Sequence, residues 1–371
     1  MLTVTELTHA LSARDLTRPE QGPHAVQLLV DEIVGALGTA LGSEVRVLRD
    51  HPVVPVEDNY ERLGYPRDAV TRDLRYSRYV SETCMLRSHT SAMIPPALRD
   101  VAARPLGRLD VLLACPGISY RRDSVDRLHT GTPHQLDLWR VVDGPLGSDA
   151  LDEAIALVLG AALPGATYRA VPTEHPYTEG GRQLDVLVDG EWVEVGECGL
   201  AAPRVLAGAG LPPRVRGVAM GLGLDRLLML RKGIPDIRLL SASDPRIAGQ
   251  LLDLLPYRPV SRHPAIVRDL SVAVAAEADA ETLGDEVRDA LGPDVVAVEE
   301  IRVLSETPVE DLPAAAVARL GARPGQKNVL LRVVLRDHSR TLSDEEANLA
   351  RDRVYAAVHR GAEHQWATED H

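Results

Sequence analysis

The strongest chemical signal in this sequence is a run of charged and polar residues between positions 120 and 137. The run contains Tyr120-Arg121-Arg122-Asp123, then Asp126 and His129, and then His134-Gln135-Leu136-Asp137. One interpretation is a surface hairpin laced with ion pairs. The other is a hairpin whose strands aim Arg121 at an α-phosphate, because phosphoryl and adenylyl transfer depend on fixed positive charge at the developing oxyanion.

A second signal is the segment Gly221-Leu222-Gly223-Leu224-Asp225-Arg226. Two spaced glycines before a helix often reflect only close packing of that helix on a strand. They would also let a ligand approach the backbone, and here Arg226 follows at the start of the expected helix. Arg121 and Arg226 would then clamp the two ends of a triphosphate, a task that suits the planar guanidinium group.

Two further segments carry weaker signals. Residues 86–91 (Leu-Arg-Ser-His-Thr-Ser) are by themselves typical of a polar turn. Residues 175–199 contain His175-Pro176-Tyr177, then Glu194 within an apolar run, and then Cys198. A carboxylate buried in an apolar strand is costly unless it is paired. Glu194 is therefore predicted to belong either to a buried ion pair or to a magnesium site.

The elements that must position these residues follow from hydrophobic periodicity and turn residues. Residues 24–41 carry apolar side chains at helical spacing, which predicts an amphipathic helix. Strands are predicted at 109–116, 134–143 and 184–196. Residues 215–233 are predicted to pass from a glycine-rich turn into a helix.

A domain boundary is expected near 256–264, where prolines interrupt the pattern. The elements predicted beyond it are a strand at 270–274, a helix at 280–291, strands at 295–304 and 328–336, and a last helix at 344–359 with a Ser343–Glu346 capping box. This β-α-β-β-α order, with room for a further short strand, predicts a ferredoxin-like α+β unit. The expected domains are therefore 1–255 and 256–371.

Composition limits the class of protein. A chain of 371 residues with 45% hydrophobic and 26% charged residues fits a soluble globular protein of two domains. No apolar run suggests a membrane span, no secretory signal is visible, and three scattered cysteines suggest neither a disulfide framework nor zinc, so we expect a cytoplasmic protein. The net charge of −13 argues against a protein that coats nucleic acid non-specifically. It does not exclude binding of a nucleic acid through a local basic patch.

Taken in order, these segments resemble phenylalanyl-tRNA synthetases, which are class II aminoacyl-tRNA synthetases. The arginine-rich run from Tyr120 resembles motif 2 of that class, and 221–226 resembles motif 3. The segments DNYERLGYP, LRSHTSA, EVGECGLAAPRVL and GLGLDRLLMLRKGIPDIR add to the likeness, and RDLSVAV and RTLSDEEAN resemble the family's ferredoxin-fold anticodon-binding domain. The resemblance covers about residues 50–360, and the helix at 24–41 is the candidate for motif 1.

The resemblance implies a fold and a set of site residues. The fold would be α+β: an antiparallel class II synthetase sheet flanked by helices, then a C-terminal ferredoxin-like domain. ATP and Mg²⁺ would be the cofactors, with Arg121 on the α-phosphate and Arg226 on the γ-phosphate and adenine. The residues implied for ATP are Arg121, Asp123, Gly221, Gly223 and Arg226; those implied for the amino acid are Ser91, His129, Gln135, Asp137, His175, Tyr177 and Cys198; and Glu194 is implied for the metal.

The chain departs from the family pattern where the substrate side chain is expected. The family's Phe-Pro-Phe is His175-Pro176-Tyr177 here, Glu197 stands where glycine is usual, Pro133 stands where an aromatic residue is usual, and Asp137 is one methylene shorter than the usual Glu. The whole chain contains no phenylalanine. Either each phenylalanine was replaced by the nearest tolerable residue, or the pocket fits a hydroxylated or otherwise polar aromatic amino acid.

The expected function is that of an aminoacyl-tRNA ligase. It would activate phenylalanine, or a related aromatic amino acid, as the aminoacyl-adenylate and transfer it to tRNA(Phe), and the absence of phenylalanine suggests a backup or resistance enzyme. One alternative is a paralogue that activates a non-standard aromatic amino acid for a biosynthetic pathway. Another is a non-catalytic regulator that binds an amino acid or tRNA. A monomer and a homodimer both remain open, because the 24–41 helix fits a dimer interface as well as its own sheet.

Arginines near the C-terminus leave the tRNA contact open as well. Five of them could form a local anticodon patch or a solvated, salt-bridged face: Arg332, Arg336, Arg340, Arg351 and Arg353.

Overall fold

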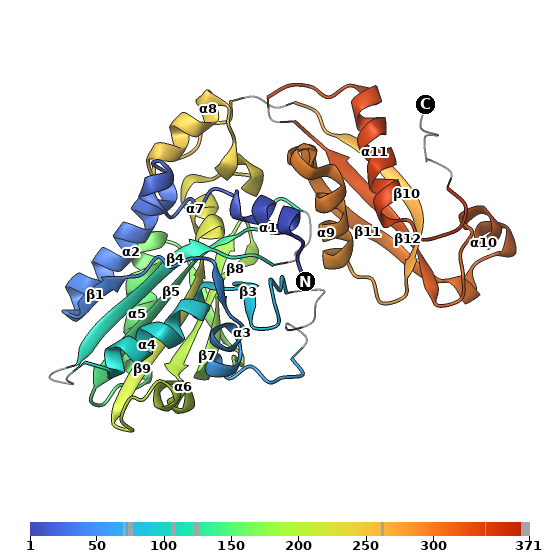
Figure 1. The fold of residues 1–371 in the computed structure, drawn as a ribbon. Helices are drawn as coiled ribbons and strands as arrows, with labels where there is room; N and C mark the ends of the chain where they lie inside the picture. Colours follow the sequence, from blue (N-terminus) through green and yellow to red (C-terminus); the bar gives the residue numbers. More distant parts are fainter. Residues whose placement is uncertain are drawn as a thin grey trace. The chain divides into compact units, whose positions relative to one another are not determined.

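The computed structural model describes residues 1–69, 72, 77–104, 109–121, 126–260, 263–337 and 339–364 (Figure 1). The chain forms two compact units, each of which is described by itself. The first contains Met1–Arg121, Thr132–Ile234 and Gly249–Tyr257. The second contains the described residues of 122–131, 235–248 and 258–371. Two short segments that precede residue 255 therefore belong to the second unit.

A seven-stranded sheet forms the centre of the first unit, in the order β1-β4-β5-β9-β8-β7-β6 (Figure 1). Every neighbouring pair is antiparallel except β1 and β4, which confirms the predicted antiparallel-dominated sheet. The strands are β1 Glu44–Val47, β4 Asp110–Ile118, β5 His134–Asp143, β6 Tyr168–Pro172, β7 Thr178–Val188, β8 Glu191–Ala201 and β9 Val215–Gly223. A separate small sheet pairs β2 Val53–Pro55 with β3 Cys84–Leu86.

Helices cover both faces of the large sheet. The helices of this unit are α1 Val4–Leu11, α2 Ala25–Leu41, α3 Val56–Asn59, α4 Ile94–Ala102, α5 Ser148–Ala162, α6 Pro203–Gly208 and α7 Leu224–Lys232. Leu112, Leu138 and Met220 face α2 and α5, with which they line a small cavity. Because side chains alternate along a strand, Leu113, Trp139 and Ala219 point to the other face, where they form a core with α4 and α6.

The predicted helix at 24–41 is confirmed as α2, Ala25–Leu41. Its apolar stripe is buried within this chain: Ala25, Val26, Leu29, Val30, Ile33, Val34 and Leu37 are each at most 7% exposed. This apolar stripe fitted both a dimer interface and packing on the helix's own sheet. In the structure it packs within its own unit.

Two predictions about local structure in this unit are wrong. The single strand predicted at 184–196 is a hairpin, in which β7 and β8 are joined at Asp189-Gly190 with φ values of 49° and 87°. The positive φ values at an Asp-Gly pair are those of a tight hairpin turn, whereas the apolar pattern continued through it. The glycines at 221 and 223 are also not in a turn, because β9 continues through both of them to the start of α7.

The second unit contains a three-stranded antiparallel sheet in the order β10-β12-β11. Its elements are α8 Pro245–Ala248, β10 Ile266–Ala275, α9 Ala280–Leu291, β11 Val298–Pro308, α10 Ala314–Leu320, β12 Gln326–Leu335 and α11 Asp344–Val358. Residues of α9 and α11 form one core with the sheet, as expected for a ferredoxin-like unit, and α10 is an addition between β11 and β12. The Ser343–Glu346 capping box is confirmed. Within the described residues, no helix is long and apolar enough to span a bilayer.

Candidate active site

Three neighbouring strands bring the central residues of the site into one row. Asp137 on β5 pairs with Gly221 on β9, and Gly221 pairs with Glu197 on β8. Directly opposed residues in an antiparallel sheet point to the same face. A Cβ atom added at Gly221 would lie 3.6 Å from Cγ of Glu197 and 3.7 Å from the hydroxyl oxygen of Tyr177. Gly221 therefore separates the carboxylates of Asp137 and Glu197, and we call this part of the sheet surface the glycine floor.

Asp137 has one satisfied carboxylate oxygen and one open one. Its side chain is buried, and Oδ2 accepts hydrogen bonds from Oγ1 of Thr90 at 2.9 Å and Oγ of Ser91 at 3.0 Å. Oδ1 makes no close hydrogen bond to a described residue, although the indole N–H of Trp139 is near enough to lower the pKa of Asp137. Burial raises the pKa of Asp137 to about 7, and the negative charge of Glu197 adds to the rise. The hydrogen bonds from the hydroxyl groups of Thr90 and Ser91 lower the pKa but do not offset burial. A cationic ligand at Oδ1 would reverse this effect.

Glu197 has the opposite surroundings. Oε1 accepts a short hydrogen bond from the hydroxyl group of Tyr177, and Oε2 lies 2.8 Å from Nε2 of His175. Burial by itself would raise the pKa of Glu197. The hydrogen bond and charge of His175, together with the hydrogen bond from Tyr177, outweigh burial, so the pKa of Glu197 is lowered. Tyr177 is stacked between Trp139 and His175, with ring centroids 6.1 and 6.0 Å away.

Tyr65 and His89 lie beside this network and were given no role from the sequence. Their rings stack at 5.6 Å with an interplanar angle of 23°. Burial lowers the pKa of His89 to about 4, although the charge of Glu197 opposes the fall and that of Arg121 adds to it, so His89 is neutral near pH 7. Burial and the charges of Glu197 and Asp137 raise the pKa of Tyr65. The segments DNYERLGYP and LRSHTSA were the only signal that could have located them.

Arg226 is held in the first turn of α7 by bonds that reach across the sheet. Its Nη1 donates to the carbonyl oxygen of Glu194 at 2.6 Å. The preceding residue, Asp225, accepts from the backbone N–H of His134 at 2.7 Å and lies 2.9 Å from Nδ1 of that ring. Nε2 of His134 accepts the backbone N–H of Leu16 at 3.0 Å, which leaves the ring proton on Nδ1, facing Asp225. Three distant segments thereby fix the start of α7.

Glu194 is exposed, so the first of its two interpretations, a buried ion pair, is wrong. Residues 194 and 197 would normally point to opposite faces of a strand, but a register shift pairs Leu184 with Gly196 and then Asp185 with Glu194. Because Glu197 pairs with Gln183, both glutamates lie opposite residues of one face of β7. The exposed carboxylate of Glu194 is compatible with Mg²⁺, which usually keeps several waters and takes one or two carboxylates beside substrate phosphates. No cluster of three metal-ligating side chains occurs among the described residues.

The remaining predicted residues are only partly brought together. Gln135 accepts from the backbone N–H of Thr90 at 3.3 Å and shares the face of Asp137. Arg121 follows β4 and the buried Tyr120. Cys198 is buried opposite Met220, on the face covered by α2 and α5. His129 belongs to the second unit, and its Nδ1 lies 2.8 Å from Oδ2 of Asp126. Asp123 lies outside the described residues.

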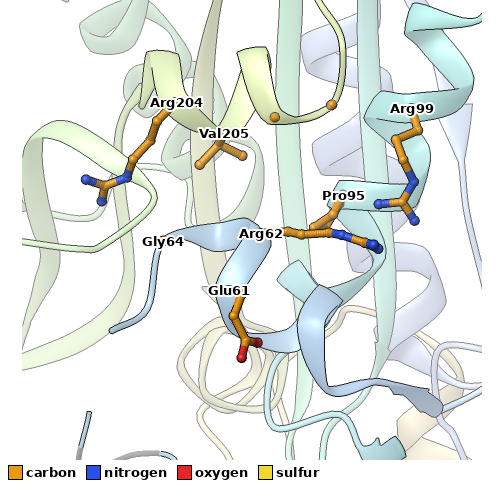
Figure 2. Close-up of a pocket in the computed structure, with 9 residues that line it drawn as sticks. Glu61, Arg62, Gly64, Pro95, Arg99, Arg204 and Val205 are labelled. Atoms are coloured by element: carbon orange, nitrogen blue, oxygen red, sulfur yellow. The ribbon is translucent and has the colours of Figure 1, made fainter. Parts of the chain in front are cut away.

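A cavity of about 310 Å³ lies outside the row, and its lining explains how the His175–Tyr177 segment is supported. Figure 2 shows Arg204 and Val205 of α6 on one side of it, with the Glu61–Gly64 segment and Pro95 and Arg99 of α4 on the other. Nη2 of Arg204 donates to the carbonyl oxygen of Pro176. Arg62 and Arg99 both bind Asp58, and Glu61 binds Arg72, so these three lining residues are already in ion pairs.

The five arginines considered for an anticodon patch do not form one surface. Each pairs with a carboxylate: Arg332 with Asp269, Arg336 with Glu299, Arg340 with Glu346, Arg351 with Asp352, and Arg353 with Asp294. Arg332 lies on the face of β12 opposite its buried residues Leu331 and Val333, whereas Arg351 and Arg353 lie on α11, which covers those residues. The salt-bridged interpretation therefore fits these side chains.

The fold and this site define a class of protein. A family model described as the class II core domain (F) of tRNA synthetases matches residues 13–251, and a model of the ferredoxin-fold anticodon-binding domain matches residues 261–365. The chain therefore belongs to the class II tRNA synthetase family.

Its curated relatives are phenylalanine–tRNA ligases. The alpha subunit from Prochlorococcus marinus (strain MIT 9313) is 34% identical over 245 residues, which cover 64% of this chain and 69% of that protein. The chloroplastic/mitochondrial ligase of Arabidopsis thaliana is 27% identical over 346 residues, which cover 89% of this chain and 75% of that protein. The probable mitochondrial ligase of Drosophila melanogaster is 27% identical over an alignment 392 residues long, gaps included, which covers 89% of this chain and 81% of that protein.

Proposed function

We propose that this chain is an aminoacyl-tRNA ligase that activates phenylalanine with ATP and transfers it to a tRNA. The observation that carries the assignment of the amino-acid site is Asp137, a buried carboxylate whose pKa is raised to about 7 and whose Oδ1 has at most the indole N–H of Trp139 as a partner among the described residues. A carboxylate in that state is suited to a substrate ammonium group. The family match and the phenylalanine–tRNA ligase relatives support the reaction class.

The amino acid would lie across the glycine floor. Its ammonium group would be held by Oδ1 of Asp137, with Ser91 and Thr90 fixing the carboxylate from the other side through Oδ2. Its ring would point along the row, toward Tyr177 and Glu197. This orientation would leave the substrate carboxylate free to approach the nucleotide, which is the requirement for an in-line reaction.

Activation needs positioning and charge rather than a protein nucleophile. The substrate carboxylate oxygen attacks the α-phosphorus of ATP, a new C–O–P linkage forms, and the bond to pyrophosphate breaks. Arg121 would neutralise the developing charge at the α-phosphate, and Arg226 would hold the γ-phosphate from the fixed start of α7. Bound Mg²⁺ would supply further neutralisation of the phosphates, with the exposed Glu194 as its protein ligand.

The acceptor and the setting complete the proposal. Residues 1–255 would form the catalytic domain, and residues 256–371, which contain the matched ferredoxin-fold region, would contact the anticodon end of tRNA(Phe). Free thiols at Cys84, Cys115 and Cys198 support a reducing compartment, for which we propose the cytoplasm. Two relatives are named as organellar, so cell fractionation distinguishes the two locations. Gel filtration distinguishes a monomer from a homodimer.

The absence of phenylalanine in the chain supports a more specific role. Synthesis of such a protein does not consume phenylalanyl-tRNA, so we propose a backup or resistance enzyme that is made when that tRNA is scarce or mischarged. Expression should persist when the ordinary synthetase is inhibited, and loss of expression under that condition would reject this role without affecting the proposed reaction.

Charging of tRNA(Phe) with labelled phenylalanine tests the reaction itself. Arg121→Ala and Arg226→Ala should each lower kcat/KM by roughly 100-fold or more, as for other groups that stabilise transition-state charge. Arg214→Ala is the matched control, because this exposed arginine pairs with Asp143 at the far end of β5. Absence of charging by the wild-type chain, or equal loss in the control, would contradict the proposal.

A further inference from the structure

The ring end of the proposed amino-acid site contains a carboxylate that neither ATP nor the ammonium group uses. Glu197 lies on the far side of Gly221 from Asp137. Its side chain is 36% exposed, so a ligand above the glycine floor can reach it. An ionised carboxylate has about four acceptor positions, of which Tyr177 and His175 occupy two.

Several polar groups keep this carboxylate ionised and in place. His175 and Tyr177 both direct their polar atoms to Glu197, and their rings stack on each other, with Trp139 behind Tyr177. The stack removes rotational freedom from the two donors. His175 is 11% exposed and Tyr177 is 1% exposed, so both donors are withheld from solvent. Partial burial of a charge is costly, and nothing in the pairing of β8 requires an acid at this position.

An unsubstituted phenyl ring is a poor partner for this end of the site. It would remove water from the free acceptor positions of Glu197 without supplying a donor. A ring hydroxyl group would donate to one of them instead. Sites built to hydrogen-bond a substrate hydroxyl discriminate strongly against the analogue that lacks it.

We propose that Glu197 recognises a hydrogen-bond donor on the ring of the amino acid, and that this chain activates ring-hydroxylated phenylalanines in addition to phenylalanine. The inference rests on the proposed adenylation at this site. Glu197 is the specificity-determining residue, and His175 and Tyr177 position its carboxylate. A hydrogen bond to a charged acceptor corresponds to roughly 10- to 100-fold in kcat/KM.

The test is amino-acid-dependent ATP–pyrophosphate exchange with phenylalanine, meta- and para-hydroxyphenylalanine, and the corresponding methyl-substituted phenylalanines. A methyl group is close to a hydroxyl group in size but donates no hydrogen bond. At one ring position at least, the hydroxyl analogue should exceed its methyl counterpart at least tenfold in kcat/KM. Equal values at both positions, or rejection of all substituted rings, would overturn the inference while exchange with phenylalanine leaves the proposed function intact.

Variants separate recognition from a structural role. Glu197→Gln keeps the side-chain shape and should reduce the hydroxyl-to-methyl ratio at least tenfold. Tyr177→Phe removes a donor that positions the carboxylate and should lower that ratio, whereas loss of a purely structural network would lower the values for all analogues together and leave the ratio unchanged. Glu191→Gln, at the exposed start of the same strand, is the matched control and should leave the ratio unchanged. Loss of exchange with every amino acid, phenylalanine included, would instead reject the proposed function.

Discussion

At the scale of single residues, Asp137 and Glu197 lie on one row of the sheet and yet have pKa values shifted in opposite directions. Asp137 has hydroxyl donors on one oxygen only, and burial dominates. Glu197 has a phenol donor and an imidazole, which outweigh burial. The difference supports the roles proposed for them: Asp137 for the substrate ammonium group, and Glu197, whose pKa is lowered, for a hydrogen-bond donor on the ring.

The first prediction concerns the pH dependence of amino-acid use. Because the pKa of Asp137 in the ligand-free protein is about 7, the group is protonated below that pH and cannot balance an ammonium charge. We expect kcat/KM for phenylalanine to rise as pH increases through about 7 in pyrophosphate exchange. Asp137→Asn should lower kcat/KM roughly 10- to 100-fold and remove this rise. A wild-type profile that is flat across neutral pH would contradict the assignment.

The second prediction is that the same substitution stabilises the ligand-free protein. The folded-state pKa of about 7 lies above the unfolded value, so the folded protein favours the protonated acid. Stability is therefore lost as pH rises between the two values, with a total penalty on the order of 4 kcal/mol well above pH 7. Urea unfolding should show Asp137→Asn to be more stable than wild type at pH 8 and nearly equal near pH 4. A variant that is less stable at pH 8 would argue against the raised pKa.

Part of the site could be predicted from the sequence, and part could not. Asp137, Gln135 and Ser91 stand in segments whose order resembles the family, and the sheet brings them together. The pairing of Glu197 with His175 and Tyr177 depends on how β7 and β8 fold against each other, which residue types alone do not specify. Glu194 was expected to be buried because its neighbours in sequence are apolar, but the bulge in this hairpin leaves it exposed.

At the scale of elements, predictions succeeded where the local signal was complete. The periodicity of α2 and the capping box of α11 each lie within one continuous segment, and both are confirmed. The β7–β8 hairpin was missed because apolar residues continue through its turn, so the strand pattern concealed Asp189-Gly190. Gly221 and Gly223 were assigned to a turn on residue type, whereas pairing with β5 keeps them extended.

The third prediction concerns the bond between β5 and α7. Asp225→Asn retains the side-chain volume but removes one of the two acceptors for His134, so the start of α7 and Arg226 should shift. We expect KM for ATP to rise roughly 10-fold or more, with KM for phenylalanine nearly unchanged. The unfolding free energy should fall by about 1–3 kcal/mol, because a buried donor is left unsatisfied.

The control for this prediction is Asp143→Asn, at the opposite end of β5, where the side chain pairs with the exposed Arg214. It should leave both KM values unchanged. Equal effects of Asp225→Asn on the two KM values would show that the bond supports the whole unit rather than the nucleotide site.

At the scale of the whole molecule, the two units should contribute to different steps. The residues proposed for activation that the structure brings together, such as Asp137 and Ser91, lie in the first unit. The five arginines considered for an anticodon patch lie in the second unit. With a net charge of −13, the proposed tRNA contact would depend on local cations, and Arg332, paired with Asp269 on the face of β12 away from its helices, is the one we propose to test.

The fourth prediction follows from this division. Arg332→Ala should leave phenylalanine-dependent pyrophosphate exchange unchanged and lower kcat/KM for tRNA charging several-fold, with a weaker dependence of tRNA binding on salt. Thermal unfolding should not change, because the pair with Asp269 is exposed. Lys327→Ala, on the opposite face of the same strand, is the matched control. An equal loss in exchange and charging would contradict the separation of steps.

The most direct test of the central claim is phenylalanine-dependent exchange of pyrophosphate into ATP by the purified chain, measured beside the other standard amino acids. We expect exchange with phenylalanine that is lost in Arg121→Ala and in Arg226→Ala, and no comparable exchange with any non-aromatic amino acid. No exchange with phenylalanine or any ring-substituted analogue, in a preparation that is folded and binds ATP, would contradict it.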